Sequence, residues 1–100
     1  MIRHIVLFKL RDFESEIRKQ EIRLKIKNRI EELPGKIDLI RRCEVGVDIR
    51  KLEMSYDIVL IMDFDNLNDL NTYTDHPAHQ EFIRFNKEFS AAKVCIDCEI

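Results

Sequence analysis

The sequence predicts an α+β fold in which helices cover one face of a four-stranded antiparallel sheet. Four segments rich in β-branched and other apolar residues have the length of strands. Two other regions carry apolar residues at spacings of three and four, which is typical of helices. These segments follow one another in the order β-α-β-β-α-β within 100 residues, the length of a single domain. We therefore expect one domain that spans residues 1–100.

The first strand is expected at Ile2 to Leu10. Its side chains alternate between two faces. One face carries Ile2, His4, Val6, Phe8 and Leu10, and the other carries Arg3, Ile5, Leu7 and Lys9. Because both faces are apolar at the centre, we expect both to be covered.

The first helix is expected from Glu14 to Leu33, where the period changes. Its apolar stripe consists of Ile22, Ile26, Ile30 and Leu33. Ile17 and Leu24 lie off this stripe. Pro34 and Gly35 end the helix, because proline cannot continue it and glycine permits the turn.

Two strands are expected next, at Leu39 to Ile49 and at Tyr56 to Phe64, with a polar connection between them. The run from Ile58 to Met62 contains no polar residue. Such a run is typical of a strand in the middle of a sheet.

The second helical region is expected to be interrupted. Residues Asn66 to Thr74 read as one helix. His76 and Pro77 then break it, because proline disfavours helical geometry at the preceding residue. Pro77 also suits the first position of a new helix, which we expect to run towards Phe89. Residues 94–100 form the closing strand.

This order is the split βαβ, or ferredoxin-like, pattern. Because crossovers are right-handed, the first and third strands are central and the helices cover one face. Ile5 and Leu7, with Val59 and Ile61, would then form an apolar patch on the other face. A patch of this kind often marks a partner site. We expect a homodimer that pairs sheet to sheet; cover by a different chain is the alternative.

Composition argues against several classes of partner. Seventeen Lys and Arg against nineteen Asp and Glu give a net charge of −2, which provides no reason to expect nucleic acid as a partner. The basic run from Arg18 to Arg29 is interleaved with Glu21, which indicates a solvated helix face. No segment has the length of a membrane span, and the apolar start is too short for a signal peptide. We expect a cytoplasmic protein without a membrane partner.

The chain has three cysteines, Cys43, Cys95 and Cys98, an odd number that argues against a disulfide framework. Cys95 and Cys98 have the CxxC spacing of zinc and redox sites. They lie in the predicted closing strand, however, where positions i and i+3 point to opposite faces. We expect buried, inert thiols.

Four segments carry a resemblance to a known family: His4–Lys9, Glu44–Gly46, Ser55–Leu60 and Tyr73–His79. In this order and at this spacing, nearly the whole chain resembles the stress-responsive dimeric α/β-barrel (Dabb) family. The Tyr-x-x-His-Pro-x-His run is the most specific part. The resemblance implies a ferredoxin-like subunit that pairs with a second copy to close a dimeric α/β barrel.

One branch of that family, similar to plant polyketide cyclases, performs an aldol-type ring closure in a pocket between helices and sheet. The resemblance assigns catalysis to Tyr73 and His79, with His4 and His76 as residues that line or support the pocket. An imidazole can take and return a proton near neutrality, and a phenol can stabilise a developing oxyanion. This chemistry needs no metal and no cofactor. We therefore expect a cavity beside His79 for a small apolar or carbonyl-containing molecule.

Other interpretations stay open. His76 could cap a helix, Tyr73 and His79 could be packing residues, and His4 could be a hydrogen-bonded core histidine. The cavity could hold a ligand without any reaction. His4, His76 and His79 could instead bind a metal, or the protein could be a cofactor-free oxygenase like some related dimeric barrels.

Overall fold

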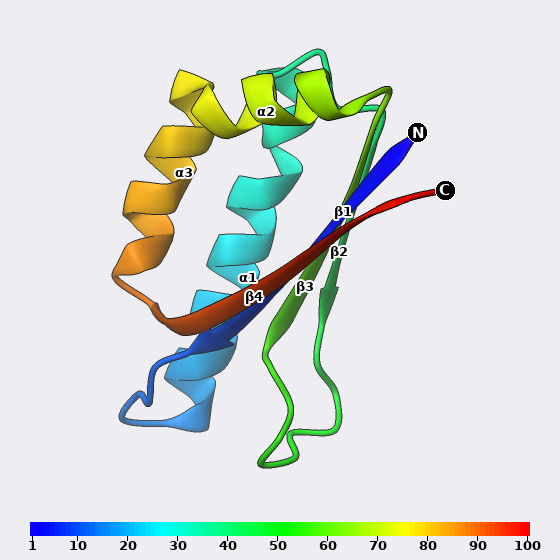
Figure 1. Ribbon diagram of the computed structural model, residues 1–100. Helices are drawn as coiled ribbons and strands as arrows, with labels where there is room; N and C mark the ends of the chain where they lie inside the picture. The colour runs from blue at the N-terminus through cyan, green and yellow to red at the C-terminus, as the bar shows by residue number, and fades with distance from the viewer.

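The computed structural model describes residues 1–100 and has the predicted order of strands and helices. The elements are β1 (Ile2–Leu10), α1 (Glu16–Glu31), the 3-10 helix η1 (Leu33–Gly35), β2 (Arg42–Val47), β3 (Ile58–Phe64), α2 (Leu67–Asp75), α3 (Pro77–Lys87) and β4 (Ser90–Glu99). The sheet has the order β2-β3-β1-β4, and all neighbouring strands are antiparallel. The three α-helices lie on one face of this sheet (Figure 1). The predicted ferredoxin-like fold is confirmed.

The helix-facing side of the sheet forms the core. Val6, Phe8 and Leu10 of β1 point to this side and are 7%, 4% and 2% exposed. Leu60 and Met62 of β3 are buried beside them. The inner face of β1 is therefore apolar except at His4.

The other side of the sheet carries no helix. Strand register places side chains of β3, β1 and β4 next to one another there, and we call this surface the open-face patch: Ile5, Leu7, Val59, Ile61, Val94 and Ile96. Val94 and Ile96 are 49% and 59% exposed, and the other four are half-buried. The patch includes two residues of β4 beyond the four that the sequence pointed to.

Helix α1 packs on the core through three of the four residues of the predicted stripe; it ends at Glu31, two residues before the predicted end, and the fourth residue, Leu33, is buried in η1. Ser15 caps the first turn of α1 by accepting a hydrogen bond from the Arg18 N–H. Ile22, Ile26 and Ile30 are completely buried, whereas Ile17, off the stripe, is 76% exposed. No helix of the chain is both long and apolar enough to cross a membrane.

Strand β2 is shorter than the predicted strand from Leu39 to Ile49. Ile40 is buried but belongs to a turn, since its N–H bonds to the Ile37 carbonyl. Ile49 lies beyond the strand and is 89% exposed. Apolar and β-branched residues fit a sheet only where a neighbouring strand is available to pair with them.

Strand β4 begins four residues before the predicted start at Val94. Ser90 and the two alanines after it have low strand propensity, but Ser90 and Ala92 pair with the end of β1, and the register shifts at the residue between them. Cys95 lies opposite Val6 and Cys98 opposite Arg3, so the two thiols point to opposite faces as predicted. The prediction that these thiols are buried is wrong, because both side chains are exposed along this edge strand.

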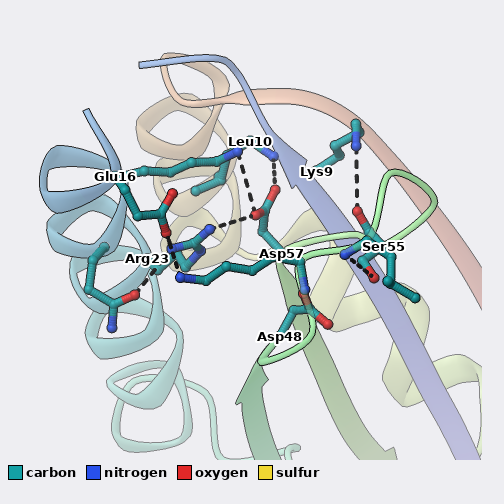
Figure 2. A network of polar contacts seen from close by, with 11 residues as sticks. Lys9, Leu10, Glu16, Arg23, Asp48, Ser55 and Asp57 are labelled. Carbon is teal, nitrogen blue, oxygen red and sulfur yellow. Dashed lines mark hydrogen bonds and ion pairs between the residues drawn. The ribbon is translucent and has the colours of Figure 1, made fainter. Parts of the chain in front are cut away.

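A buried ion pair joins α1 to the start of β3 (Figure 2). The Arg23 side chain is 3% exposed and donates to Asp57 Oδ1 at 3.2 Å and to Glu16 Oε1 at 2.8 Å. Asp57 also accepts the Leu10 N–H at 2.7 Å. Lys51, followed by Arg23, lowers the pKa of Glu16 to about 2. These contacts tie together the end of β1, helix α1 and the connection that enters β3.

Candidate active site

A cavity of about 540 Å³ lies between the helices α2 and α3 and the strands β1 and β4. Three of the four predicted site residues line it: His4, Tyr73 and His79. The floor is apolar and is formed by side chains that include Val6, Phe8, Leu60 and Phe82. A volume of this size is typical of small-molecule sites, which span roughly 300–1,000 Å³.

The junction between α2 and α3 places His79 at this cavity. His76 has an extended backbone, with ψ of 137°, and Pro77 takes the first position of α3. His76 caps α3, because its Nδ1 accepts the Ala78 N–H at 3.0 Å. Ala78 would otherwise donate to the Thr74 carbonyl one helical turn earlier. The break in the helix therefore leaves the Thr74 carbonyl free for side chains.

His79 forms a hydrogen bond with this free carbonyl. Its Nδ1 lies 2.9 Å from the Thr74 oxygen, and Gln80 Nε2 donates to the same oxygen at 2.7 Å. A carbonyl can only accept, so Nδ1 carries the proton and Nε2 has the lone pair in the neutral ring. Burial lowers the pKa of His79 and outweighs the hydrogen bond to Thr74, which raises it; nearby His4 and Lys93 add to the effect of burial. At neutral pH, His79 is thus an unprotonated base of fixed tautomer.

Tyr73 packs against this base. It is 1% exposed, and its ring centroid lies 4.3 Å from that of His79, 5.0 Å from that of Phe64 and 6.1 Å from that of His4. Burial raises the pKa of Tyr73 far above its ordinary value, and nearby Cys43 adds to this effect. The phenol therefore keeps its proton at neutral pH and can act only as a hydrogen-bond donor or acceptor.

His4 is oriented by a carboxylate on the neighbouring strand. Asp97 lies opposite His4 in the β1–β4 register, and its Oδ1 is 2.5 Å from His4 Nδ1. Since the carboxylate accepts, Nδ1 carries a proton, and the other ring nitrogen is free to meet a ligand. The His4 side chain is 15% exposed.

His76 differs from the other three residues. It caps α3 and is not part of the cavity wall. It can support the site through the helix that carries His79, and it also acts to lower the pKa of His79. The three histidines are not placed as metal ligands, because no three His, Cys, Asp or Glu side chains lie close enough together to hold a metal ion.

Two groups that set up this site were not identified from the sequence. One is Asp97, the carboxylate that orients His4. The sequence feature that could have pointed to it is an acidic residue within a strand that is otherwise mostly apolar. Its partner depends on strand register, which the sequence did not define. The other is the Thr74 carbonyl, a backbone atom. Its signal was Pro77 three residues after Thr74, because a new helix begins at the proline and the Ala78 N–H is then taken by the His76 cap instead of the Thr74 carbonyl.

Comparison with known proteins identifies relatives over the whole chain. The chain is 34% identical to an uncharacterized protein of Streptomyces coelicolor over 91 residues, which cover 90% of this chain and 91% of the relative. A crystal structure of a dimeric protein of unknown function and ferredoxin-like fold from Bacteroides fragilis is 37% identical, with a TM-score of 0.88, and the match covers 99% of this chain and 95% of that one.

A more distant structure shares the fold. The hydroxynitrile lyase from Passiflora edulis is 16% identical, with a TM-score of 0.80 over 99% of this chain and 92% of that chain. The family model that matches is the stress responsive A/B barrel domain (Dabb), and the match extends over residues 2–100. The chain therefore belongs to the stress responsive A/B barrel domain family.

Proposed function

We propose that this protein is a homodimer that binds a small, largely apolar carbonyl compound and removes a proton from the carbon next to the carbonyl. The observation that carries the proposal is the tautomer of His79. Its Nδ1–H is held by the Thr74 carbonyl, so Nε2 is a base in the wall of an apolar cavity. A base of lowered pKa is unprotonated at neutral pH and is ready to accept a proton.

The neighbouring groups suit the rest of the reaction. As Nε2 of His79 takes the C–H proton, the electron pair moves onto the carbonyl oxygen, and the Tyr73 hydroxyl donates a hydrogen bond to that oxygen. In an aldol-type closure the enolate carbon then forms a C–C bond with a second carbonyl of the same molecule. The new alkoxide takes its proton from the His79 imidazolium, which restores the base. The neutral His4 ring, whose Nδ1–H is held by Asp97, can accept a hydrogen bond at Nε2 from a hydroxyl of the ligand.

The homodimer is supported by the open-face patch. Six apolar side chains lie together on a face that no helix of the chain covers. The structure from Bacteroides fragilis, 37% identical to this chain, is described as dimeric. Burial of such a patch against a second copy removes apolar surface from water and favours association.

Deuterium exchange tests the reaction without knowledge of the natural substrate. We expect the protein to accelerate exchange of the hydrogens next to the carbonyl of 4-phenylbutan-2-one in heavy water, followed by NMR. The His79→Ala variant should lose this acceleration by about a hundredfold or more, since a positioned base contributes ~10²–10⁴-fold. Tyr73→Phe should show a smaller loss.

The matched control is His76→Asn, which keeps a side-chain acceptor at the cap of α3 and should exchange like wild type. Exchange that survives in His79→Ala would contradict the assignment of the base. If the wild type binds the ketone without accelerating exchange, the protein is a binding protein and not an enzyme of this kind.

A further inference from the structure

The charged residues in the cavity wall are of one sign only. Seventeen residues line the cavity, and none of them is Asp or Glu. Lys87, at the end of α3, and Lys93, in β4, are both part of the wall. This contrasts with the whole chain, which has more acidic than basic residues. The cavity therefore favours an anionic ligand over a cationic one.

Neither cavity lysine is neutralised within the chain. The lysines that form ion pairs are Lys19, Lys27, Lys36 and Lys51. Lys93 is close enough to His79 to lower the pKa of that histidine. Both cavity lysines thus have their charge available to a ligand.

Two polar atoms in the same wall also lack a partner. Asn86 Oδ1 and Ser90 Oγ are buried and form no hydrogen bond, and both residues line the cavity. Asn86 is 6% exposed overall. A buried polar atom without a partner destabilises the fold, so a ligand that bonds to these groups would offset a cost already present in the folded chain. The other buried atom of this kind, Arg23 Nε, belongs to the ion-pair cluster at α1.

Asn86 and Lys87 lie at the far end of α3 from the proposed base, whereas Lys93 of β4 is close enough to act on it. Asn86 follows His79 by seven positions in α3, which is two turns or roughly 10 Å of helix rise. Between them, Phe82 and Ile83 contribute apolar side chains to the cavity wall. The cavity therefore has a basic and hydrogen-bonding end, an apolar middle and the His79–Tyr73 end.

We propose that Asn86, Lys87, Ser90 and Lys93 form a carboxylate-binding subsite, so that the natural ligand is an apolar molecule with a carboxylate at one end. Ser Oγ–H and the Asn Nδ2 can each donate to a carboxylate oxygen, and a half-turn of the Asn amide exchanges its Oδ1 and Nδ2. The two lysines supply the opposite charge. The inference rests on the proposed function only in placing the reacting carbonyl at the His79 end.

The test uses two compounds of matched size that carry no ketone: 4-phenylbutyrate and its uncharged amide. We expect the wild type to bind the carboxylate about tenfold or more tightly than the amide in calorimetric titrations at low salt, with a smaller preference at high salt. In the Lys87→Gln/Lys93→Gln variant the preference should fall to threefold or less. The Lys27→Gln/Lys36→Gln variant removes two charges from the α1 region and should keep the full preference.

A second pair of variants tests the unpartnered atoms. Ser90→Ala and Asn86→Leu should each weaken binding of the carboxylate several-fold while leaving the melting temperature unchanged or raising it, because they remove polar groups that the fold does not use. A merely structural role for these residues would lower the melting temperature instead.

Equal binding of the two compounds by the wild type would overturn the subsite. It would also be overturned by a preference for the carboxylate that persists in the Lys87→Gln/Lys93→Gln variant, or by one that is lost equally in the Lys27→Gln/Lys36→Gln control. If neither compound binds, the subsite is also overturned. Deuterium exchange on the uncharged ketone still tests the base in each of these cases, so the two proposals fail separately.

Discussion

At the scale of single residues, the base of this site is oriented by a backbone atom. The Thr74 carbonyl fixes which nitrogen of His79 carries the proton, and the Asp97 carboxylate does the same for His4. Two histidines of the same cavity thus have different kinds of partner. Burial, and not the Thr74 carbonyl, lowers the pKa of His79, because the hydrogen bond to that carbonyl acts in the opposite direction.

The lowered pKa of His79 predicts a pH dependence of stability. The ordinary value is 6.5, and burial lowers it in the folded chain, so the unfolded chain binds this proton more tightly. The stability that the neutral ring contributes is complete above pH 6.5 and is lost as the pH falls through the folded-state pKa. Between about pH 7.5 and 5, the free energy of unfolding should fall more steeply for the wild type than for His79→Gln in chemical denaturation. Parallel curves would contradict a buried neutral His79.

Part of the site could be predicted from the sequence, and part could not. Tyr73 and His79 lie in one short motif whose local geometry follows from Pro77, so their proximity could be inferred from the chain itself. Asp97 lies 93 positions from His4, and only the β1–β4 register brings them together. Sequence periodicity gives the face of a strand but not its register, and the unpartnered state of Asn86 depends on packing that periodicity does not describe.

At the scale of elements, strand and helix ends differ from the prediction where tertiary contacts override local preference. Ser90 extends β4 because β1 offers a free edge, and Ile49 leaves β2 although its residue type favours a strand. Arg23 was expected on a solvated helix face, yet it is buried because Asp57 approaches α1 from the connection that follows β2. A charge run alone does not show which member of the run will meet a buried partner.

The Arg23–Asp57 pair predicts non-additive effects on stability. Asp57→Asn keeps the acceptor for the Leu10 N–H but leaves Arg23 with less compensation, and it should cost about 3 kcal/mol of unfolding free energy. The double variant Arg23→Met/Asp57→Asn should cost less than Asp57→Asn alone, because no uncompensated charge stays buried. Denaturant titrations of the single and double variants measure this difference.

The exposed pair of Arg42 with Glu44 provides the comparison, since its side chains are 46% and 54% exposed. Glu44→Gln should change stability by no more than about 0.5 kcal/mol, because Glu44 pairs only with Arg42, whereas Arg42 also lies 4.0 Å from the buried Asp63 carboxylate. If the two single changes in the buried pair were simply additive, the pair would not be coupled as the geometry indicates.

At the scale of the whole molecule, the sheet has one face covered by helices and one face that no element of the chain covers. The core lies between the sheet and the helices, whereas the open-face patch lies on the far side of β1 and β3. The alternation of β1 indicated this division in the sequence. The contribution of Val94 and Ile96 was not anticipated, because it required the pairing of β4 with β1.

The open-face patch predicts that the protein is a dimer in solution. Light scattering after gel filtration should give twice the 12.0 kDa mass of the chain. Ile61→Lys should raise the dimer dissociation constant about a hundredfold or more, since a two-fold interface contains each substitution twice and a hundredfold change is about 2.8 kcal/mol. Ile17→Lys, on the exposed side of α1, should leave the mass unchanged. A wild-type mass of one chain at micromolar concentration would contradict the dimer.

The break between α2 and α3 has a consequence for how the family can diverge. A descendant with another residue at position 77 can extend the helix through the junction and return an N–H to the carbonyl at position 74. The histidine at position 79 then loses its acceptor, although Pro77 itself does not line the cavity. The proposed proton transfer therefore requires Pro77 and His79 together, because the proline frees the acceptor that orients the histidine.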